Sequence, residues 1–453
     1  MAQSRDTGGE ARNVIKDLGD GLILRRSTSE DAERLARFNA AIHANTTTKV
    51  SNEPVAAWTR DLLSGRHPTF GVGDFTLVED LHTGEIVSAL CLIPQRWSYE
   101  DIEFGVGRPE IVATHPDYRR RGLVRAQFDL IHAWSAERGD LMQAITGIPW
   151  YYRQFGYEMG LELGGGRAGF TSQIPALKPG QVEPYLIQAA TGGDIPFVTE
   201  MYAQMARRGI VSCVRAGALW RHELSGHSPD SAGRNEIRVI ENAAGDHCGM
   251  LVHGYELQSA AIPLYSYELK PGLSFLDATP SVLRYLARMG QEYVVRDKVA
   301  EWSSYYFSLG SDHPVYHVTP DFLPQIHRPY AWYVRVTNLP GFLRLVSPVL
   351  ERRLAASAVA GHSGELKINL YTSGLRITLE GGKVASVEGW QPESVHDGAA
   401  GFPDLSFLQL LLGYRSLDEI KYAYADCGTR GSDTPALLDA LFPTRVSHVW
   451  GML

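Results

Sequence analysis

Residues 111–125 contain the side chains whose types and spacing best fit anion binding. The apolar run 111–114 is broken by His115-Pro116-Asp117, and four arginines and a glycine follow. Beyond them apolar side chains recur at helical spacing as far as Arg138. The sequence therefore predicts a buried strand, a tight turn and a helix.

The start of this predicted helix is a candidate phosphate site. The first N–H groups of a helix have no carbonyl partner within it, and the helix dipole favours negative charge there. Gly122 lets the backbone approach a phosphate closely, and arginines at 119, 120, 121 and 125 add positive charge. We expect a pyrophosphate as the ligand; the alternative is an ordinary solvated turn.

A second motif follows the apolar run 141–145. Residues 146–157 read Thr-Gly-Ile-Pro-Trp-Tyr-Tyr-Arg-Gln-Phe-Gly-Tyr, so that Tyr152 stands four positions before Gly156. Taken together, the two motifs resemble the GNAT superfamily of acetyl-CoA-dependent N-acetyltransferases.

This resemblance implies roles for both motifs. GNAT proteins bind the CoA pyrophosphate with Arg/Gln-x-x-Gly-x-Gly/Ala, which this chain matches except at Val124. Their tyrosine before the Gly-aromatic corner protonates the departing thiolate, which assigns Tyr152 as general acid; the alternative is that Tyr152 only packs among aromatic rings. The implied acetyl-CoA-binding residues are Val112, Ala113 and Thr114, whose backbone pairs with the pantetheine arm, then Arg120, Arg121, Gly122, Leu123, Val124 and Arg125, and finally Gly147 and Ile148.

Composition and charge narrow the function classes. The 453 residues are enough for about three domains, and 44% hydrophobic with 21% charged residues is typical of a globular protein. A formal net charge of -8 argues against nucleic acid as the main partner and allows an acidic cleft for cationic amines.

Cysteine and histidine spacing predicts no metal site. Cys91, Cys213, Cys248 and Cys427 form no Cys-x-x-Cys pair, and no His-x-x-x-His lies on a predicted helix. There is no run of 18 apolar residues and no signal-peptide core near the start. We therefore expect no membrane span, no secretion by that route, and a reducing cytoplasm as the compartment.

The first half of the chain predicts the order β-α-α-β-β-β-α-β. A strand at 22–26 precedes helices at 32–44 and within 45–68, and a hairpin joins 75–79 to 85–93. A strand at 97–106 is expected to turn at residues 107–109 into the central strand. Residues 1–19 are polar and suggest a flexible leader.

The same pattern recurs about 162 residues further along the chain. Residues 185–189 with Thr191 and Asp194 match 22–26 with Thr28 and Asp31, and the hairpin 238–251 matches 76–89. The second copy has no Arg-x-x-Gly-x-Gly equivalent after residue 266. We expect a degenerate copy and one CoA site per chain.

The last third predicts a separate α+β region. Strands are expected at 332–336, and a hairpin at 364–379 continues through Gly381-Gly382 to 387, with helices at 340–360 and 404–412. This region resembles the sterol-carrier-like domain of Eis (enhanced intracellular survival) type acetyltransferases. The order of all these motifs extends the resemblance over nearly the whole chain.

The expected fold class is α+β with mixed sheets. It comprises a leader at 1–19, a catalytic GNAT domain at 20–170, a degenerate GNAT-like domain at 171–320 and a sterol-carrier-like domain at 321–453.

Eis-type proteins acetylate amines, including those of aminoglycosides and lysines, assemble as hexamers and use their own C-terminal carboxylate as general base. The resemblance therefore implies acetyl-CoA as co-substrate, a homohexamer and Leu453 as base. The alternative is that the chain end is frayed and that an internal Asp or Glu is the base.

The leading hypothesis is direct acetyl transfer to small cationic amines in a ternary complex. The rival is a lipid- or hydrophobic-ligand-binding protein that uses the C-terminal domain, with the GNAT copies as scaffold. The intact motif at 119–124 and Tyr152 favour the enzyme.

Overall fold

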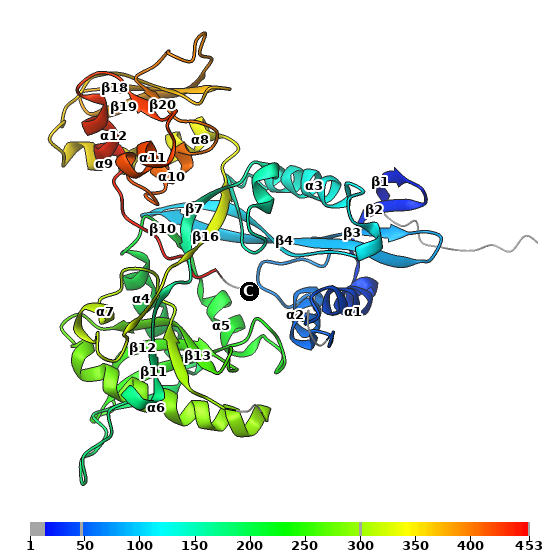
Figure 1. The fold of residues 1–453 in the computed structure, drawn as a ribbon, viewed down its shortest axis with the longest axis vertical. Helices are drawn as coiled ribbons and strands as arrows, with labels where there is room; N and C mark the ends of the chain where they lie inside the picture. Colours follow the sequence, from blue (N-terminus) through cyan, green and yellow to red (C-terminus); the bar gives the residue numbers. More distant parts are fainter. Residues whose placement is uncertain (1–13, 46–48, 299–300, 452–453) are drawn as a thin grey trace, which may run out of the picture. The chain divides into compact units, whose positions relative to one another are not determined.

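The computed structural model describes residues 14–45, 49–298 and 301–451, which divide into two compact units (Figure 1). Unit 1 comprises the described residues up to 94, then 107–139 and 226–233. Unit 2 comprises 95–106, 140–225 and the described residues from 234 on. Strands β4 (Glu85–Tyr99) and β5 (Ile102–Thr114) contribute residues to both units.

Unit 1 is a sheet with three helices. Its strands run in the order β1 (Val14–Gly19), β2 (Leu22–Arg26), β3 (Phe75–Asp80), β4 and β5, and its helices are α1 (Ala32–Ile42), α2 (Glu53–Leu63) and α3 (Leu123–Glu137). Leu123 packs α3 against Leu22, Leu24, Val78 and Val87 of the sheet. The predicted helices and the strands predicted at 22–26, 75–79 and 85–93 are confirmed. The strand predicted at 97–106 is wrong, because residues 97–99 end β4 and β5 begins only at Ile102, after a turn.

Strand β1 shows that the prediction of a flexible leader is wrong for residues 14–19; residues 1–13 lie outside the described residues. Val14–Gly19 pairs antiparallel with β2. The turn residues Asp20 and Gly21 have φ of 52° and 73°, the left-handed values that a two-residue hairpin turn needs. The turn, rather than burial, fixes this exposed strand.

The prediction of a turn at residues 107–109 is also wrong, because β5 passes through them without a break. Arg108 is buried and its Nη2 contacts Glu110 Oε1 at 2.5 Å. Gly105, just before this stretch, allows close packing: a Cβ on it would lie 2.6 Å from Asp140 Oδ1. Tertiary contacts therefore override the local turn signal.

A segment from much later in the chain completes unit 1. Asp61 of α2 is 4% exposed, and its carboxylate accepts hydrogen bonds from the backbone N–H and the hydroxyl of Ser228. The N–H of Ala232 donates to the Pro54 carbonyl oxygen at 3.0 Å. These contacts satisfy a carboxylate that burial would otherwise penalise.

Unit 2 begins with strands that extend from residues 95–106. The order is β5, β6 (Met142–Ile145), β16 (Tyr330–Arg335) and β7 (Glu158–Leu163), and β10 (Val211–Cys213) pairs with residues 97–99 of β4. Strand β16, predicted at 332–336, is thus inserted between β6 and β7.

Unit 2 also contains a seven-stranded sheet. Its order is β15 (Gln325–His327), β8 (Gly166–Phe170), β14 (Ser304–Phe307), β13 (Ala261–Leu269), β12 (His247–Gly254), β11 (Asn235–Asn242) and β9 (Tyr185–Ala189). Four helices belong to the same part of the chain: α4 (Ile195–Ala206), α5 (Gly217–Ser225), α6 (Phe275–Asp297) and α7 (Val315–Val318).

The internal duplication is visible in this strand order. The sequence β9-β11-β12-β13-β14 repeats the sequence β2-β3-β4-β5-β6, with a long helix before the last strand in each case. Helix α6 starts with Ser274 as N-cap, where α3 starts with Gly122. The fold is therefore mixed α/β with two GNAT-like copies, as predicted.

The last part of unit 2 is a five-stranded sheet with short helices, shown in yellow to red in Figure 1. The strand order is β19 (Lys383–Trp390), β18 (Gly374–Glu380), β17 (Gly364–Asn369), β20 (Ala400–Gly401) and β21 (Gly428–Thr429). The helices are α8 (Leu339–Leu345), α9 (Ser347–Ala355), α10 (Phe407–Leu411), α11 (Leu417–Ala423) and α12 (Thr434–Leu441). The hairpin prediction is confirmed, whereas the helix predicted at 340–360 is two helices with Pro348 at the start of the second.

Candidate active site

Gly122 is the N-cap of α3 and has φ +76° and ψ 7°. This left-handed conformation turns the chain from the short 3₁₀ turn Pro116–Tyr118 into the helix. The first hydrogen bond of the helix runs from Ala126 N–H to the Gly122 carbonyl oxygen, so helical geometry gives the N–H groups of Leu123 and Val124 no helical acceptor. The predicted strand, turn and helix is confirmed, with N–H donors directed out of its start.

The end of β5 presents backbone groups on the edge opposite β4. The N–H of His115 donates to the Val87 carbonyl oxygen of β4. Because backbone groups alternate in direction along a strand, the N–H and C=O groups of Ala113, two residues earlier, also point toward β4. Val112 and Thr114 therefore direct their N–H and C=O groups away from β4. This geometry suits an extended ligand that pairs as an added strand, although the Thr114 carbonyl oxygen already accepts a hydrogen bond from Arg119 Nε.

The arginines around Gly122 are exposed at the surface of unit 1. Arg121 contacts Asp20 Oδ2 at 3.2 Å, and its guanidinium lies 5.4 Å from the ring centroid of Tyr118. Arg120 has φ +63°, so a residue in the left-handed conformation stands on each side of Arg121, namely Arg120 and Gly122. The positive charge predicted for this surface is therefore present.

Tyr118 supports the turn in a way that sequence reasoning missed. Its hydroxyl donates to Asp80 Oδ2 at 2.6 Å, and this bond lowers the pKa of the Asp80 carboxyl. The two residues are 38 positions apart and carry no common motif, so no local signal in the sequence links them.

A buried hydrogen-bond network also fixes α3 against the sheet. Gln127 Nε2 donates to Thr76 Oγ1 at 2.8 Å, and the Ser88 hydroxyl donates to Gln127 Oε1 at 2.6 Å. Ser88 Oγ lies 2.8 Å from Thr114 Oγ1, at the end of β5. The network thus joins α3 to β3, β4 and the predicted pantetheine-binding strand.

Gln127→Leu is expected to lower the free energy of unfolding of unit 1 by about 1–3 kcal/mol, because it removes the buried hydrogen bonds that Gln127 makes with Thr76 and Ser88 at nearly unchanged volume. Thermal denaturation measures this. Gln181→Leu, which changes an exposed glutamine, is the control and should leave the midpoint unchanged. Equal midpoints for both variants would show that the network adds no stability.

The second motif lies in unit 2, where Tyr152 is 3% exposed within the 3₁₀ segment Tyr151–Phe155. Its ring packs edge-on against Tyr151 and Tyr333, with centroids 5.3 and 5.8 Å away. Trp150 has φ +64°, and its N–H donates to the Tyr333 hydroxyl at 2.6 Å. The aromatic packing predicted as the alternative role of Tyr152 is therefore real, and it also fixes the direction of the phenol.

Gly147 brings backbone close to that phenol. Its φ is +118°, and a Cβ at this position would lie 3.7 Å from Tyr152 Oη. Ile148, the next predicted acetyl-CoA-binding residue, is 49% exposed. The structure therefore places Gly147, Ile148 and Tyr152 in one loop after β6, as the motif suggests.

Leu453, the predicted base, lies outside the described residues. The chain that leads to it is described as far as Gly451. Val449 is buried, and its carbonyl oxygen accepts a hydrogen bond from Trp332 Nε1 at 3.0 Å. The segment before residue 451 is therefore packed into unit 2.

The described residues contain neither a metal-binding cluster nor a membrane-spanning helix. No group of three or more His, Cys, Asp or Glu side chains has an arrangement suited to a metal ion. Within the same ranges, no helix has the length and apolarity needed to cross a bilayer.

Comparison with known proteins gives a family match for the first copy. Residues 24–160 match the family described as Acetyltransferase (GNAT) domain. No curated protein matches the chain.

Solved structures share the fold over almost the whole chain. A probable N-acyltransferase of Enterococcus faecalis V583 has a TM-score of 0.62 at 14% identity, covering 95% of this chain and 100% of its own. A GCN5-related N-acetyltransferase from Kribbella flavida has 0.61 at 15% identity, covering 95% and 100%. Eis1 from Mycobacterium abscessus has 0.56 at 14% identity, covering 94% and 99%.

The family match includes β5, the turn at Gly122, α3 and Tyr152. Residues 24–160 therefore form a GNAT acetyltransferase domain, and the protein is an acyltransferase.

Proposed function

We propose that the protein transfers the acetyl group of acetyl-CoA to an amino group of a small cationic amine of the aminoglycoside, polyamine or lysine type. The observation that carries the proposal is the left-handed Gly122 at the start of α3, with exposed arginines around it, inside a GNAT domain. Residues 120–125 bind the pyrophosphate of CoA, and the edge of β5 at Val112 to Thr114 binds the pantetheine arm.

The proposed reaction is direct attack in a ternary complex. The neutral amine adds to the thioester carbonyl carbon, the C–S bond then breaks, and the sulfur takes a proton from the Tyr152 phenol. The adduct nitrogen loses one proton as the amide forms, and this proton restores the phenol. An alkyl ammonium with a pKa of about 10.4 must first lose a proton, which the Leu453 carboxylate accepts directly or through water. Gly147 and Ile148 line the path of the thioester beside Tyr152.

Release of CoA thiol tests the function. The full-length protein is incubated with acetyl-CoA and a panel of polyamines, aminoglycosides and lysine peptides, and the free thiol is measured against a blank without amine. Amine-dependent release is expected for at least one cationic acceptor. Release that no amine accelerates would refute the proposed transfer and favour the rival role in binding hydrophobic ligands.

The terminal carboxylate gives a prediction of its own. C-terminal amidation at Leu453 is expected to reduce kcat/KM by at least about tenfold, because it removes the base and keeps every side chain. Affinity for acetyl-CoA and the midpoint of thermal unfolding should stay unchanged. Full activity after amidation would exclude this carboxylate and point to an internal acid.

We extend the proposal to the organisation of the protein. The catalytic domain spans 20–170, the degenerate copy 171–320 and a sterol-carrier-like domain 321–453, in a homohexamer that works in the cytoplasm. The similarity of fold to Eis1 from Mycobacterium abscessus supports the order of the domains. Light scattering of the purified protein measures the oligomeric state.

A further inference from the structure

Residues 446–450 are held in unit 2 by contacts along their whole length. The N–H groups of Ile210 and Val211 both donate to Ser447 Oγ at 2.9 Å, and the Glu162 N–H donates to the Ser447 carbonyl oxygen at 3.1 Å. His448 forms a parallel β-bridge with Glu162 of β7. The segment is therefore fixed through both its backbone and its side chains.

Two glycines of unit 2 admit the segment at close range. A Cβ on Gly209 would lie 2.9 Å from Ser447 Cα, and a Cβ on Gly310 would lie 2.8 Å from His448 Cβ. Gly310 also has φ +83°, a conformation that favours glycine. Both positions show a surface shaped to this segment.

Arg215 holds the other end of the segment. It is 4% exposed, its Nη2 donates to the Trp450 carbonyl oxygen at 2.9 Å, and its guanidinium lies 3.7 Å from the centroid of the Trp450 ring. Tyr202 and Trp220 enclose the same guanidinium at 4.8 and 5.0 Å. Its Nε and Nη1 atoms are buried and have no hydrogen-bond partner among the described residues.

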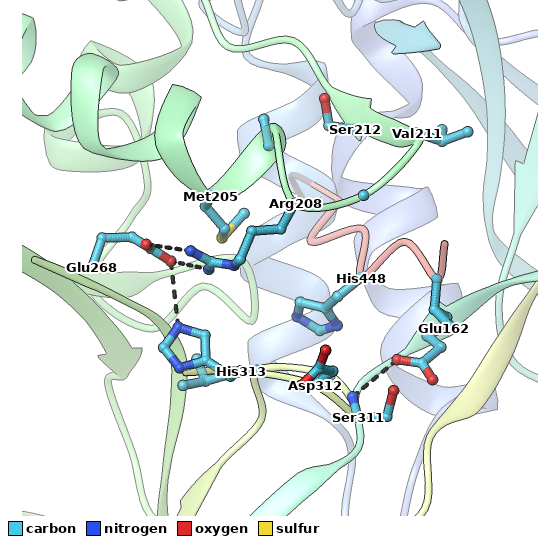
Figure 2. A pocket seen from close by; sticks show the side chains of 15 residues that line it. Glu162, Met205, Arg208, Val211, Ser212, Glu268, Ser311, Asp312, His313 and His448 are labelled. Atoms are coloured by element: carbon cyan, nitrogen blue, oxygen red, sulfur yellow. Dashed lines mark hydrogen bonds and ion pairs between the residues drawn. The ribbon is translucent and has the colours of Figure 1, made fainter. Parts of the chain in front are cut away.

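The His448 side chain occupies the edge of a small charged cavity, shown in Figure 2, of about 50 Å³. Glu268 of β13 pairs with Arg208, which follows α4, and lies 3.5 Å from His313 Nε2. The other charged groups that face the cavity are Glu162, which accepts the Ser311 N–H, and Asp312. His448 is partly exposed as a residue, but its Nδ1 is buried without a partner among the described residues.

We propose that Arg215 and His448 are positioning residues for acetyl transfer: they hold residues 446–450, and through them the chain that ends in Leu453, and protonation of His448 releases this segment. The inference rests on the proposed function only in its link to the reaction. The anchoring itself follows from the contacts of Ser447, His448 and Trp450.

The direction of the pH effect follows from the charges around His448. Burial, and then the charges of His313 and Arg208, lower the pKa of His448 to about 4, and burial likewise lowers the pKa of His313. Burial alone would raise the pKa of Glu268, but Arg208 and His313 hold this pKa below its usual value. Glu268 therefore stays charged between pH 7.5 and 5.5.

A released segment carries a histidine with an ordinary pKa of about 6.5. Anchoring is therefore fully present above pH 6.5 and is lost as the pH falls toward 4, because the released state binds the proton more tightly. Between pH 7.5 and 5.5 the ratio of released to held segment should rise about tenfold.

Hydrogen exchange of the ligand-free, full-length protein tests the release. The amides of Ile210 and Val211 report on it, since Ser447 is their acceptor, and rates are compared as protection factors at pH 7.5 and 5.5. Protection should fall about tenfold in the wild type and His317→Asn, an exposed control, and should not fall in His448→Phe. Equal protection of the wild type at both pH values, or an unchanged fall in His448→Phe, would overturn the pH-dependent release.

Kinetics test the positioning role. Arg215→Ala should lower kcat at least tenfold with unchanged acetyl-CoA affinity, and Arg215→Lys should recover part of the loss because it can still donate to Trp450. Arg288→Ala, which removes another arginine stacked on an aromatic ring, is the control. An unchanged kcat in Arg215→Ala would refute the role.

The two measurements separate the inference from the proposed function. Exchange is measured without acetyl-CoA or amine, so a pH-dependent segment in a protein without transferase activity would leave the anchoring and refute the function. An active enzyme in which the protection of Ile210 and Val211 does not change with pH would support the function and refute the pH-dependent release.

Discussion

Gly122→Val is expected to weaken acetyl-CoA binding at least a hundredfold. Valine disfavours φ +76°, so the turn that directs the N–H groups of Leu123 and Val124 must change. A Cβ at Gly122 would meet no described protein atom within 4 Å, so the side chain would extend into the space where the phosphate is expected. Titration calorimetry with acetyl-CoA measures the loss.

Gly139→Val is a closely matched control at the other end of the same helix. Gly139 also has φ +76° and no described protein atom within 4 Å of an added Cβ. It should cause the same conformational strain and a similar fall in thermal stability while acetyl-CoA binding persists. Equal affinity for acetyl-CoA in the two variants would contradict the assignment of the phosphate site to Gly122.

Tyr152→Phe is expected to lower kcat by about 10²–10⁴-fold with little change in acetyl-CoA affinity, because it removes a proton donor that acts as the thiolate departs. The aromatic packing against Tyr151 and Tyr333 is retained, so the fold should persist. Steady-state rates with a saturating amine and calorimetry with acetyl-CoA separate the two effects.

Tyr151→Phe provides the comparison for this variant, because Tyr151 is the preceding residue of the same 3₁₀ segment. It should retain most of the wild-type rate. If both variants keep full turnover, the proton reaches the thiolate from another group and Tyr152 has only its packing role.

The local features of the candidate site could be predicted from the sequence. The residues that end the strand, His115-Pro116, and the glycine that precedes the helical pattern are all local signals of a turn. The structure confirms the turn, with Gly122 in the left-handed conformation. The second motif likewise specifies a loop in which Gly147 and Tyr152 come together. These features depend on residues close to one another in the sequence.

The features that were missed are set by burial and by packing rather than by a local motif. Nothing local in the stretch around Pro109 reveals that Arg108 is buried against Glu110 within one long strand, or that Asp80 receives the Tyr118 hydroxyl. The short helices α11 and α12 are buried by packing with their neighbours rather than marked by a long periodic pattern. The sequence pattern of a single segment cannot specify such pairings.

The hydrogen bonds from Ser228 to Asp61 have a consequence for how the protein is made. The ribosome emits α2 long before it emits residues 226–233, so the nascent chain holds Asp61 without two of its donors for more than a third of synthesis. At about 5–20 residues per second this interval lasts roughly ten to thirty seconds. Unit 1 therefore reaches its final stability only after half of the chain has been translated, and an amino-terminal fragment that stops before Ser228 should be less stable than the same residues in the full-length protein.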